Sequence, residues 1–102
     1  MAAPTIYGAL TWSDVSNVSS TSVPVPTGLA NLDRWFAAIV SDPAGETYTY
    51  PGTGVWTEEW NDQSFQTSSS FSLAYKTAGA SESAASVTLG TSERSAGVSF
   101  AV

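Results

Sequence analysis

Apolar residues along this chain come in short runs, and residues that favour turns separate the runs. The longest run, residues 35–40, contains no polar residue. If this run is a strand, alternate residues from Trp35 lie on one face and alternate residues from Phe36 on the other, so both faces are apolar. If it is a helix, Asn31 can cap its start and Leu32 joins its apolar stripe. Periodicity alone leaves both interpretations open.

The segments around this run favour a central strand over a lone helix. Ser and Thr, which suit turns and exposed strand faces better than helices, are abundant throughout the chain. Short β-favouring segments recur at intervals of about 8–12 residues, which is typical of β-sandwiches. Besides 35–40, the predicted strands cover residues 5–12, 15–23 (an edge strand or extended segment), 46–50, 55–60, 71–76, 86–89 and 96–102.

Turn-forming residues bound these strands. The predicted turns lie at residues 13–14, 27–28, 41–45, 51–54, 61–63 and 90–94, with a loop of small residues at 77–84. The chain is therefore predicted to be all-β, an antiparallel β-sandwich that is jelly-roll-like and has about eight short strands. One face of the central run should fill the core. The other, carrying either Trp35 or Phe36, needs a loop, a second sheet or another chain to cover it.

Size and composition indicate a single β-sandwich domain over residues 1–102. The apolar fraction of 42% is that of an ordinary globular protein, and four residues each of Trp, Tyr and Phe supply bulky core material. Because the chain has no Cys, it can form neither a disulfide nor a thiolate metal site. Its stability has to come from packing, alone or with other chains.

The charge balance bears on possible partners. The net charge is −6, and the basic residues are Arg34, Lys76 and Arg94 alone. This is too few for a basic patch, so binding to nucleic acid or to an anionic membrane surface is not expected. The first residues lack the basic and apolar regions of a signal peptide, and no run approaches the roughly 20 apolar residues that span a bilayer. Assembly in the cytoplasm is consistent with this pattern.

No residue pattern points to an enzyme. The chain has neither His nor Cys, so the commonest general base and a thiol nucleophile are missing. No Ser lies in a Gly-x-Ser-x-Gly setting. Lys76 follows an alternating strand and is expected to face solvent, and Glu58 and Glu59 are adjacent, so a strand would point them to opposite faces. We expect no enzymatic activity and no catalytic residue.

Carboxylate and amide groups in the predicted turns are the candidates for a metal site. They are Asp14, Asp33, Asp42, Asn61 and Asp62, whose oxygen atoms suit calcium. No Asp-x-Asp-x-Asp-Gly spacing links them, and such residues are common in solvated turns. We therefore expect no metal and no other cofactor.

The aromatic residues allow two interpretations. Trp12, Trp56 and Trp60, with Tyr48 and Tyr50, would form a stacking platform for sugar rings if they shared an exposed sheet face. The alternative is that the large aromatic residues serve the core or subunit contacts, in which aromatic residues are also enriched. This second interpretation is favoured. The expected interface residues are Trp12, Trp35, Phe36, Trp56 and Trp60.

Three segments in order, 28–41, 51–57 and 73–89, carry a resemblance to a known module. They contain an apolar strand after Asn31-Leu-Asp, then Pro-Gly-Thr-Gly-Val-Trp-Thr, then Leu-Ala-Tyr-Lys and a loop ending in Ala-Ser-Glu. This pattern resembles a small β-sandwich module of tailed-phage virion proteins, which reads Gly-Asp before the strand, Pro-x-Gly-Trp-Thr, apolar-Tyr-Arg and Ala-x-x-Glu-Pro. Here Asn31-Leu-Asp replaces the Gly-Asp step, Val55 is inserted, Lys76 replaces Arg and Ser83 replaces Pro.

The resemblance implies a structural role on a virus particle and transfers no catalytic residue. The expected function is that of a capsid decoration (cement) protein, located on the capsid exterior and stabilising a phage head. The expected partners are the major capsid protein and further copies of the chain, a homo-oligomer taken as a trimer at a symmetry axis. The alternative, from another class, is a carbohydrate-binding or tail/fibre module in host recognition.

Overall fold

The structure is a computed structural model that describes residues 6–42, 45–52, 54–65 and 69–102. For residues 7–18, 62–65 and 91–93 it describes the backbone alone. The described residues form antiparallel strands. The strands are β1 (Tyr7–Val23), β2 (Arg34–Ser41), β3 (Tyr48–Thr49), β4 (Thr57–Phe65), β5 (Ser69–Thr77) and β6 (Ala85–Ala101).

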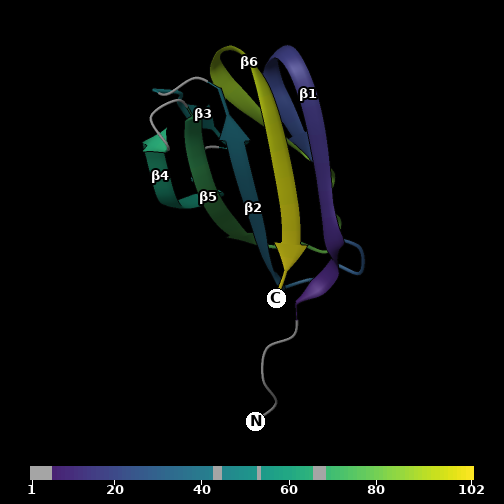
Figure 1. The fold of residues 1–102 in the computed structure, drawn as a ribbon. Coiled ribbons are helices and arrows are strands. Elements are labelled where there is room, and N and C mark those ends of the chain that lie inside the picture. The colour runs from purple at the N-terminus through teal and green to yellow at the C-terminus, as the bar shows by residue number, and fades with distance from the viewer. Residues whose placement is uncertain (1–5, 43–44, 53, 66–68) are drawn as a thin grey trace.

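The strands are arranged in two layers that share β1 and β6 (Figure 1). The larger layer has the order β1-β6-β2-β5-β4 and uses the first part of β1 and the last part of β6. The smaller layer consists of the last part of β1, the first part of β6, and β3. Buried residues of the two layers form one hydrophobic cluster. The predicted antiparallel β-sandwich is therefore confirmed.

Strands β1 and β6 are much longer than predicted, with 17 residues each. Each joins two predicted strands, and the turns expected at 13–14 and 90–94 are wrong because those residues continue a ladder. Register shifts near Val15, Val18 and Ser20 interrupt the ladder instead. Such irregularities bend and twist a strand without ending it. Residues 90–94, which looked like a turn, therefore lie where β6 passes from one layer to the other, whereas residues 13–14 pair in regular register within the larger layer.

Gly90 shows why a glycine is needed near this passage. A Cβ atom at Gly90 would lie 2.7 Å from Oε1 of Glu46, which is closer than non-bonded heavy atoms approach a Cβ atom. The same Oε1 accepts hydrogen bonds from the backbone N–H groups of Gly90, at 2.5 Å, and Thr47, at 2.9 Å. The missing side chain therefore admits a buried carboxylate that ties the loop before β3 to β6.

The central run forms strand β2, so the strand prediction is confirmed and the helical alternative is excluded. Its neighbours are β5 on one side and β6 on the other. Burial alternates along it: Trp35 is 1% exposed, whereas Val40 on the opposite face is 38% exposed. The Trp35 face fills the sandwich core, and the Phe36 face lies outside.

Of the turns predicted at 51–54 and 61–63, the structure has only the first. The turn at 51–54 is confirmed, since the N–H of Val55 bonds to the carbonyl of Gly52 and Gly52 has a φ of 75°. The turn predicted at 61–63 is wrong, because those residues belong to β4. A register shift between Glu58 and Trp60 bends that strand instead.

The backbone of the turn before β2 is strained at Leu32. Leu32 has a φ of 73°, a left-handed conformation that glycine adopts more easily than leucine. Its N–H bonds to the carbonyl of Ala78, and the Asp33 side chain accepts the N–H of Ala30 at 2.8 Å. These bonds hold Leu32 in place although its side chain is 75% exposed.

Replacing Trp35 should be the more damaging of two matched truncations. We expect Trp35→Ala to lower the free energy of unfolding by about 3–5 kcal/mol, because it empties the core and leaves the Ser99 hydroxyl without its donor. The control, Val55→Ala at an exposed position, should change it by less than about 0.5 kcal/mol. Urea denaturation followed by circular dichroism measures both, and equal losses would contradict the assignment of Trp35 to the core.

Replacing Leu32 should stabilise the protein. We expect Leu32→Gly to raise the free energy of unfolding by about 0.5–1 kcal/mol, because glycine relieves the left-handed strain and the exposed leucine side chain contributes little packing. Leu32→Ala is the control, since alanine keeps the strain. A gain of the same size in the alanine variant would show that strain is not the cause.

Candidate functional site

The buried side of β5 is lined with small and hydroxyl side chains. Ser70, Ser72 and Ala74 are all fully buried. The large apolar residues of the same strand, such as Phe71 and Leu73, alternate with them and face outward. The strand predicted at 71–76 implies by alternation that Phe71, Leu73 and Tyr75 share one face. The structure confirms this, and the face that they share is the outer one.

Strand β6 has the same arrangement, with small residues facing the core and large apolar residues facing outward. Its buried positions are Ser95, Gly97 and Ser99, whereas Val98 and Phe100 alternate with them on the outside. A Cβ atom at Gly97 would lie 3.1 Å from Val23 Cγ2, so the two layers approach each other closely here. Many of the large apolar side chains of the larger layer therefore point away from the sandwich core.

The buried hydroxyl groups are all paired within the described part of the chain. The indole Nε1 of Trp35 donates to the Ser99 hydroxyl at 2.5 Å, and the hydroxyls of Thr21 and Ser95 bond across the two layers. Ser72 donates to a carboxylate oxygen of Glu58 at 2.6 Å. These bonds offset the cost of burying polar groups and allow a partly polar interior.

The residues that point outward from the larger layer form the candidate site, called the outer face here. Cross-strand partners lie on the same side of a sheet, so the ladder registers define it. Its described members are Phe36, Ala38 and Val40 of β2, Phe71, Leu73 and Tyr75 of β5, Ala96, Val98 and Phe100 of β6, and Thr57 and Trp60 of β4, which lie opposite Tyr75 and Leu73.

Aromatic rings form a ridge at one end of the outer face. The rings of Phe36 and Phe100 stack with centroids 5.0 Å apart and planes inclined by 8°. Tyr75 lies on the other side of Phe36, at 5.7 Å. The guanidinium of Arg34 lies 4.6 Å from the centre of the Tyr75 ring and marks this end of the face with a positive charge.

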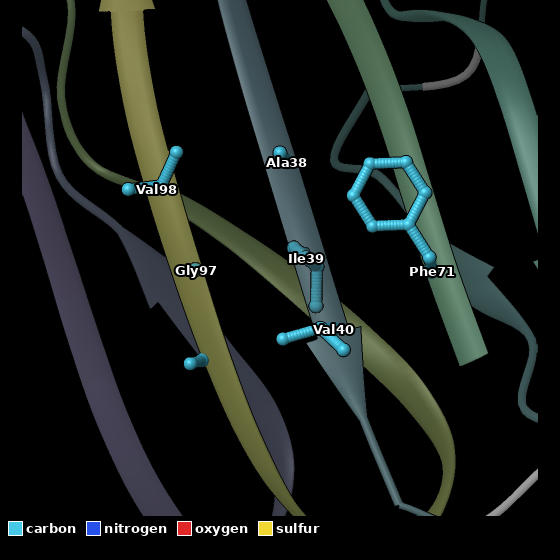
Figure 2. A pocket seen from close by; sticks show the side chains of 7 residues that line it. Ala38, Ile39, Val40, Phe71, Gly97 and Val98 are labelled. Atoms are coloured by element: carbon cyan, nitrogen blue, oxygen red, sulfur yellow. The ribbon is translucent and has the colours of Figure 1, made fainter. Parts of the chain in front are cut away.

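A hollow lies toward the other end of the outer face, where the residues are smaller (Figure 2). Its volume is about 310 Å³. The hollow is lined by Ala38, Ile39, Val40, Phe71, Ala96, Gly97 and Val98. Small residues on β2 and β6 form its floor, and the Phe71 ring stands on β5 at its side. This lining is apolar, so the hollow suits another apolar side chain rather than a charged ligand.

The expected interface residues divide between the two sides of the sheet. Phe36 and Trp60 lie on the outer face, and the side chain of Trp60 is 61% exposed. Trp35 lies in the core, and Trp56 packs edge-on against it with ring centres 5.0 Å apart. Trp12 is opposite Val98 in the ladder, but its side chain lies outside those that the structure describes.

Strict alternation along the strand predicted at 55–60 would place Trp56, Glu58 and Trp60 on one face, and this expectation is wrong. The register shift between Glu58 and Trp60 places Trp60 opposite outward-facing Leu73, whereas Glu58 reaches inward to Ser72. A bulge reverses the alternation of a strand, and a periodic pattern cannot reveal it.

The rings of a sugar-stacking platform do not lie on one surface. Tyr48 is buried and bonds through its hydroxyl to Ser41 at 2.7 Å. Tyr50 bonds to Ser72 at 2.9 Å, and burial raises the pKa of its hydroxyl far above the ordinary value. Trp56 lies 5.4 Å from Tyr50 at the rim of the core, on the side away from Trp60.

A second hollow, called the rim pocket here, lies beside Trp56. Its volume is about 300 Å³, and its lining includes Trp35, Trp56, Lys76 and Glu82. The Lys76 ammonium bonds to Glu82 at 2.8 Å and lies 6.0 Å from the centre of the Trp56 ring. Burial raises the pKa of the Glu82 carboxyl, but the Gly79 N–H and the Lys76 ammonium lower it more, so the net pKa is below its ordinary value.

Comparison with models of known protein families, with curated proteins and with solved structures finds no match to this chain. Across the described ranges no three acidic residues come together in a group that could hold a metal ion. No helix in the described part of the chain is long and apolar enough to cross a membrane.

The sequence patterns predicted the outer face, the candidate site, only in part. The alternation of Phe71 and Leu73 with small residues was visible, but it fits a strand whose large side chains face inward equally well. The decisive signal was the two-sided run at 35–40, because only one of its faces can belong to the core.

The ion pair at the rim pocket should contribute stability only when Glu82 is ionised. Because the folded-state pKa is lowered, the contribution is present above the unfolded pKa and is lost as pH falls through the lower folded value. We expect Glu82→Gln to cost about 1 kcal/mol at pH 7 and almost nothing once the wild-type carboxyl is protonated. Urea denaturation of both proteins from pH 7 down to acidic pH measures this difference. A cost that does not change with pH would contradict a stabilising role of the ionised Glu82 carboxylate.

Proposed function

We propose that this chain is a viral structural protein, a capsid decoration protein that binds the outer surface of a phage head and stabilises it as part of an oligomer. Its partners are the major capsid protein and further copies of itself. It works by burying apolar surface in contacts between protein chains, and those contacts oppose disruption of the shell. No chemical step is involved.

The outer face is the observation that supports this proposal most strongly. Phe36, Tyr75 and Phe100 form a partly exposed ring cluster, and Trp60 is largely exposed at the edge. Clustered apolar residues that stay partly exposed on one face often mark a contact surface for another protein. A sheet face that is apolar on its outward side fits a protein that completes its packing by assembly.

Charge and the resemblance to virion modules support the location. A net charge of −6 repels nucleic acid and so fits the outside of a nucleic-acid container better than the inside. The resembled module has Gly-Asp before its central strand, and Leu32 of this chain stands before Asp33 with the left-handed φ that glycine favours. The local backbone here therefore fits a glycine-based pattern.

A second candidate, a carbohydrate-binding module in a tail or fibre, is favoured by the rim pocket. Trp56 offers an apolar ring there, and the ion pair of Lys76 and Glu82 supplies polar groups beside it. A ring with nearby hydrogen-bonding groups suits a sugar. This function would use the rim pocket rather than the outer face.

Binding to empty heads of the virus that encodes the chain tests the first proposal. We expect saturable co-sedimentation and a higher temperature of head disruption when the protein is bound. Ala38→Asp, which places a charge in the middle of the outer face, should weaken binding at least about tenfold, because an unpaired charge would be desolvated. Ser86→Asp, on an exposed position of the smaller layer, is the matched control.

The outcomes separate the two candidates. A folded protein that ignores empty heads would overturn the decoration role. Binding on a glycan array that is lost in Trp56→Ala and kept in Ala38→Asp would establish the second candidate instead.

A further inference from the structure

We infer that a second copy of this chain covers the outer face, with the strands of the two copies antiparallel and a twofold axis crossing the strands at Ala38. The inference goes beyond the proposed function, because this pairing needs no capsid and holds for the purified chain. It also specifies a twofold pair where a threefold oligomer was expected from the sequence.

Residues of opposite charge lie at the two ends of β2. Arg34 begins the strand, and Asp42 directly follows its last residue, with the Asp42 N–H bonded to the carbonyl of Arg94 at 3.2 Å. Ala38 lies midway between the two charges, and the residues between them on this face are apolar. A half-turn about an axis across the strands at Ala38 places Arg34 of each copy opposite Asp42 of the other.

Arg94 lies beside Asp42 and adds a positive charge at that end of the face. It belongs to β6, whose other end carries the neutral side chain of Val102 next to Arg34. In the antiparallel pair β6 lies over β6, so Arg94 faces that neutral end rather than Arg34 of the second copy. The pairing therefore brings no two arginine residues of the described chain into opposition.

Shape favours the same orientation as charge. The ridge formed by Phe36, Tyr75 and Phe100 lies at the Arg34 end, and the apolar hollow of about 310 Å³ lies toward the Asp42 end. The antiparallel half-turn sets the ridge of each copy above the hollow of the other. An axis along the strands would instead place ridge on ridge and Arg34 on Arg34.

The area is sufficient for a weak, reversible pair. Four strands spaced about 4.8 Å apart, each with about eight residues rising about 3.3 Å, cover about 500 Å². Two such faces bury about 1,000 Å², which reaches the lower limit of specific protein interfaces. Face-to-face packing of two sheets at about 10 Å is also the arrangement that apolar sheet faces ordinarily adopt. A flat face that pairs with itself closes with two copies.

Sedimentation equilibrium on the purified full chain tests the pairing. We expect a dimer that dissociates on dilution. Ala38→Asp should shift the dissociation constant upward by at least about tenfold with an unchanged circular dichroism spectrum, and Ser86→Asp should leave it unchanged. A folded wild-type chain that stays monomeric at high concentration would overturn the inference.

Charge exchange tests the orientation without altering the apolar residues. Arg34→Asp and Asp42→Arg should each weaken the dimer by about 5–30-fold, and the double exchange should restore it, because each pair occurs twice across the twofold axis. If the neutral variant Arg34→Ala strengthens the dimer, two arginine residues oppose each other and the antiparallel axis is wrong. If the double exchange is as weak as the singles, the two residues do not meet.

These results are independent of the capsid experiment. A chain that dimerises but ignores empty heads upholds the pairing and removes the decoration role. A chain that binds heads as a monomer through the outer face upholds the decoration role and overturns the pairing.

Discussion

The pairing of buried hydroxyl groups is the constraint on which the sandwich depends. The larger layer turns Ser72 and Ser99 toward the interior, where an unpaired hydroxyl costs about 1–3 kcal/mol. Tyr50 and the indole of Trp35 supply their partners. The small serine side chains also leave room for the indole, which is the largest buried group of the core. Because side chains alternate along a strand, the bulky apolar residues of β5 and β6 lie on the opposite side from these serines. These outward residues form much of the outer face.

The parts of the fold that the sequence predicted are those governed by local chemistry. The apolar run of β2, the glycine turn at 51–54 and the loop of small residues near 77–84 each follow from short-range preferences. The two-sided character of β2 also predicted that one face needs a cover from elsewhere. Which face would be outside was not predictable, because Trp35 and Phe36 are equally apolar.

The parts that the sequence did not predict depend on ladder irregularities and on distant contacts. Bulges carry β1 and β6 through both layers and move Trp60 to the opposite side of β4 from Glu58. A bulge adds one residue without any characteristic residue type, so periodicity cannot locate it. The rim pocket likewise needs Trp56 and Lys76 to meet across strands, and no spacing in the sequence encodes that meeting.

The long ladder between β1 and β6 also determines when the molecule can fold. Tyr7 pairs with Ala101, so the two halves of this ladder are separated by nearly the whole described chain. Folds dominated by such distant pairs have high contact order and form slowly. During synthesis β1 leaves the ribosome long before its partner β6 is made, so the apolar residues of β1 stay unpacked until then. The net charge of −6 then keeps unfinished chains apart until β6 arrives.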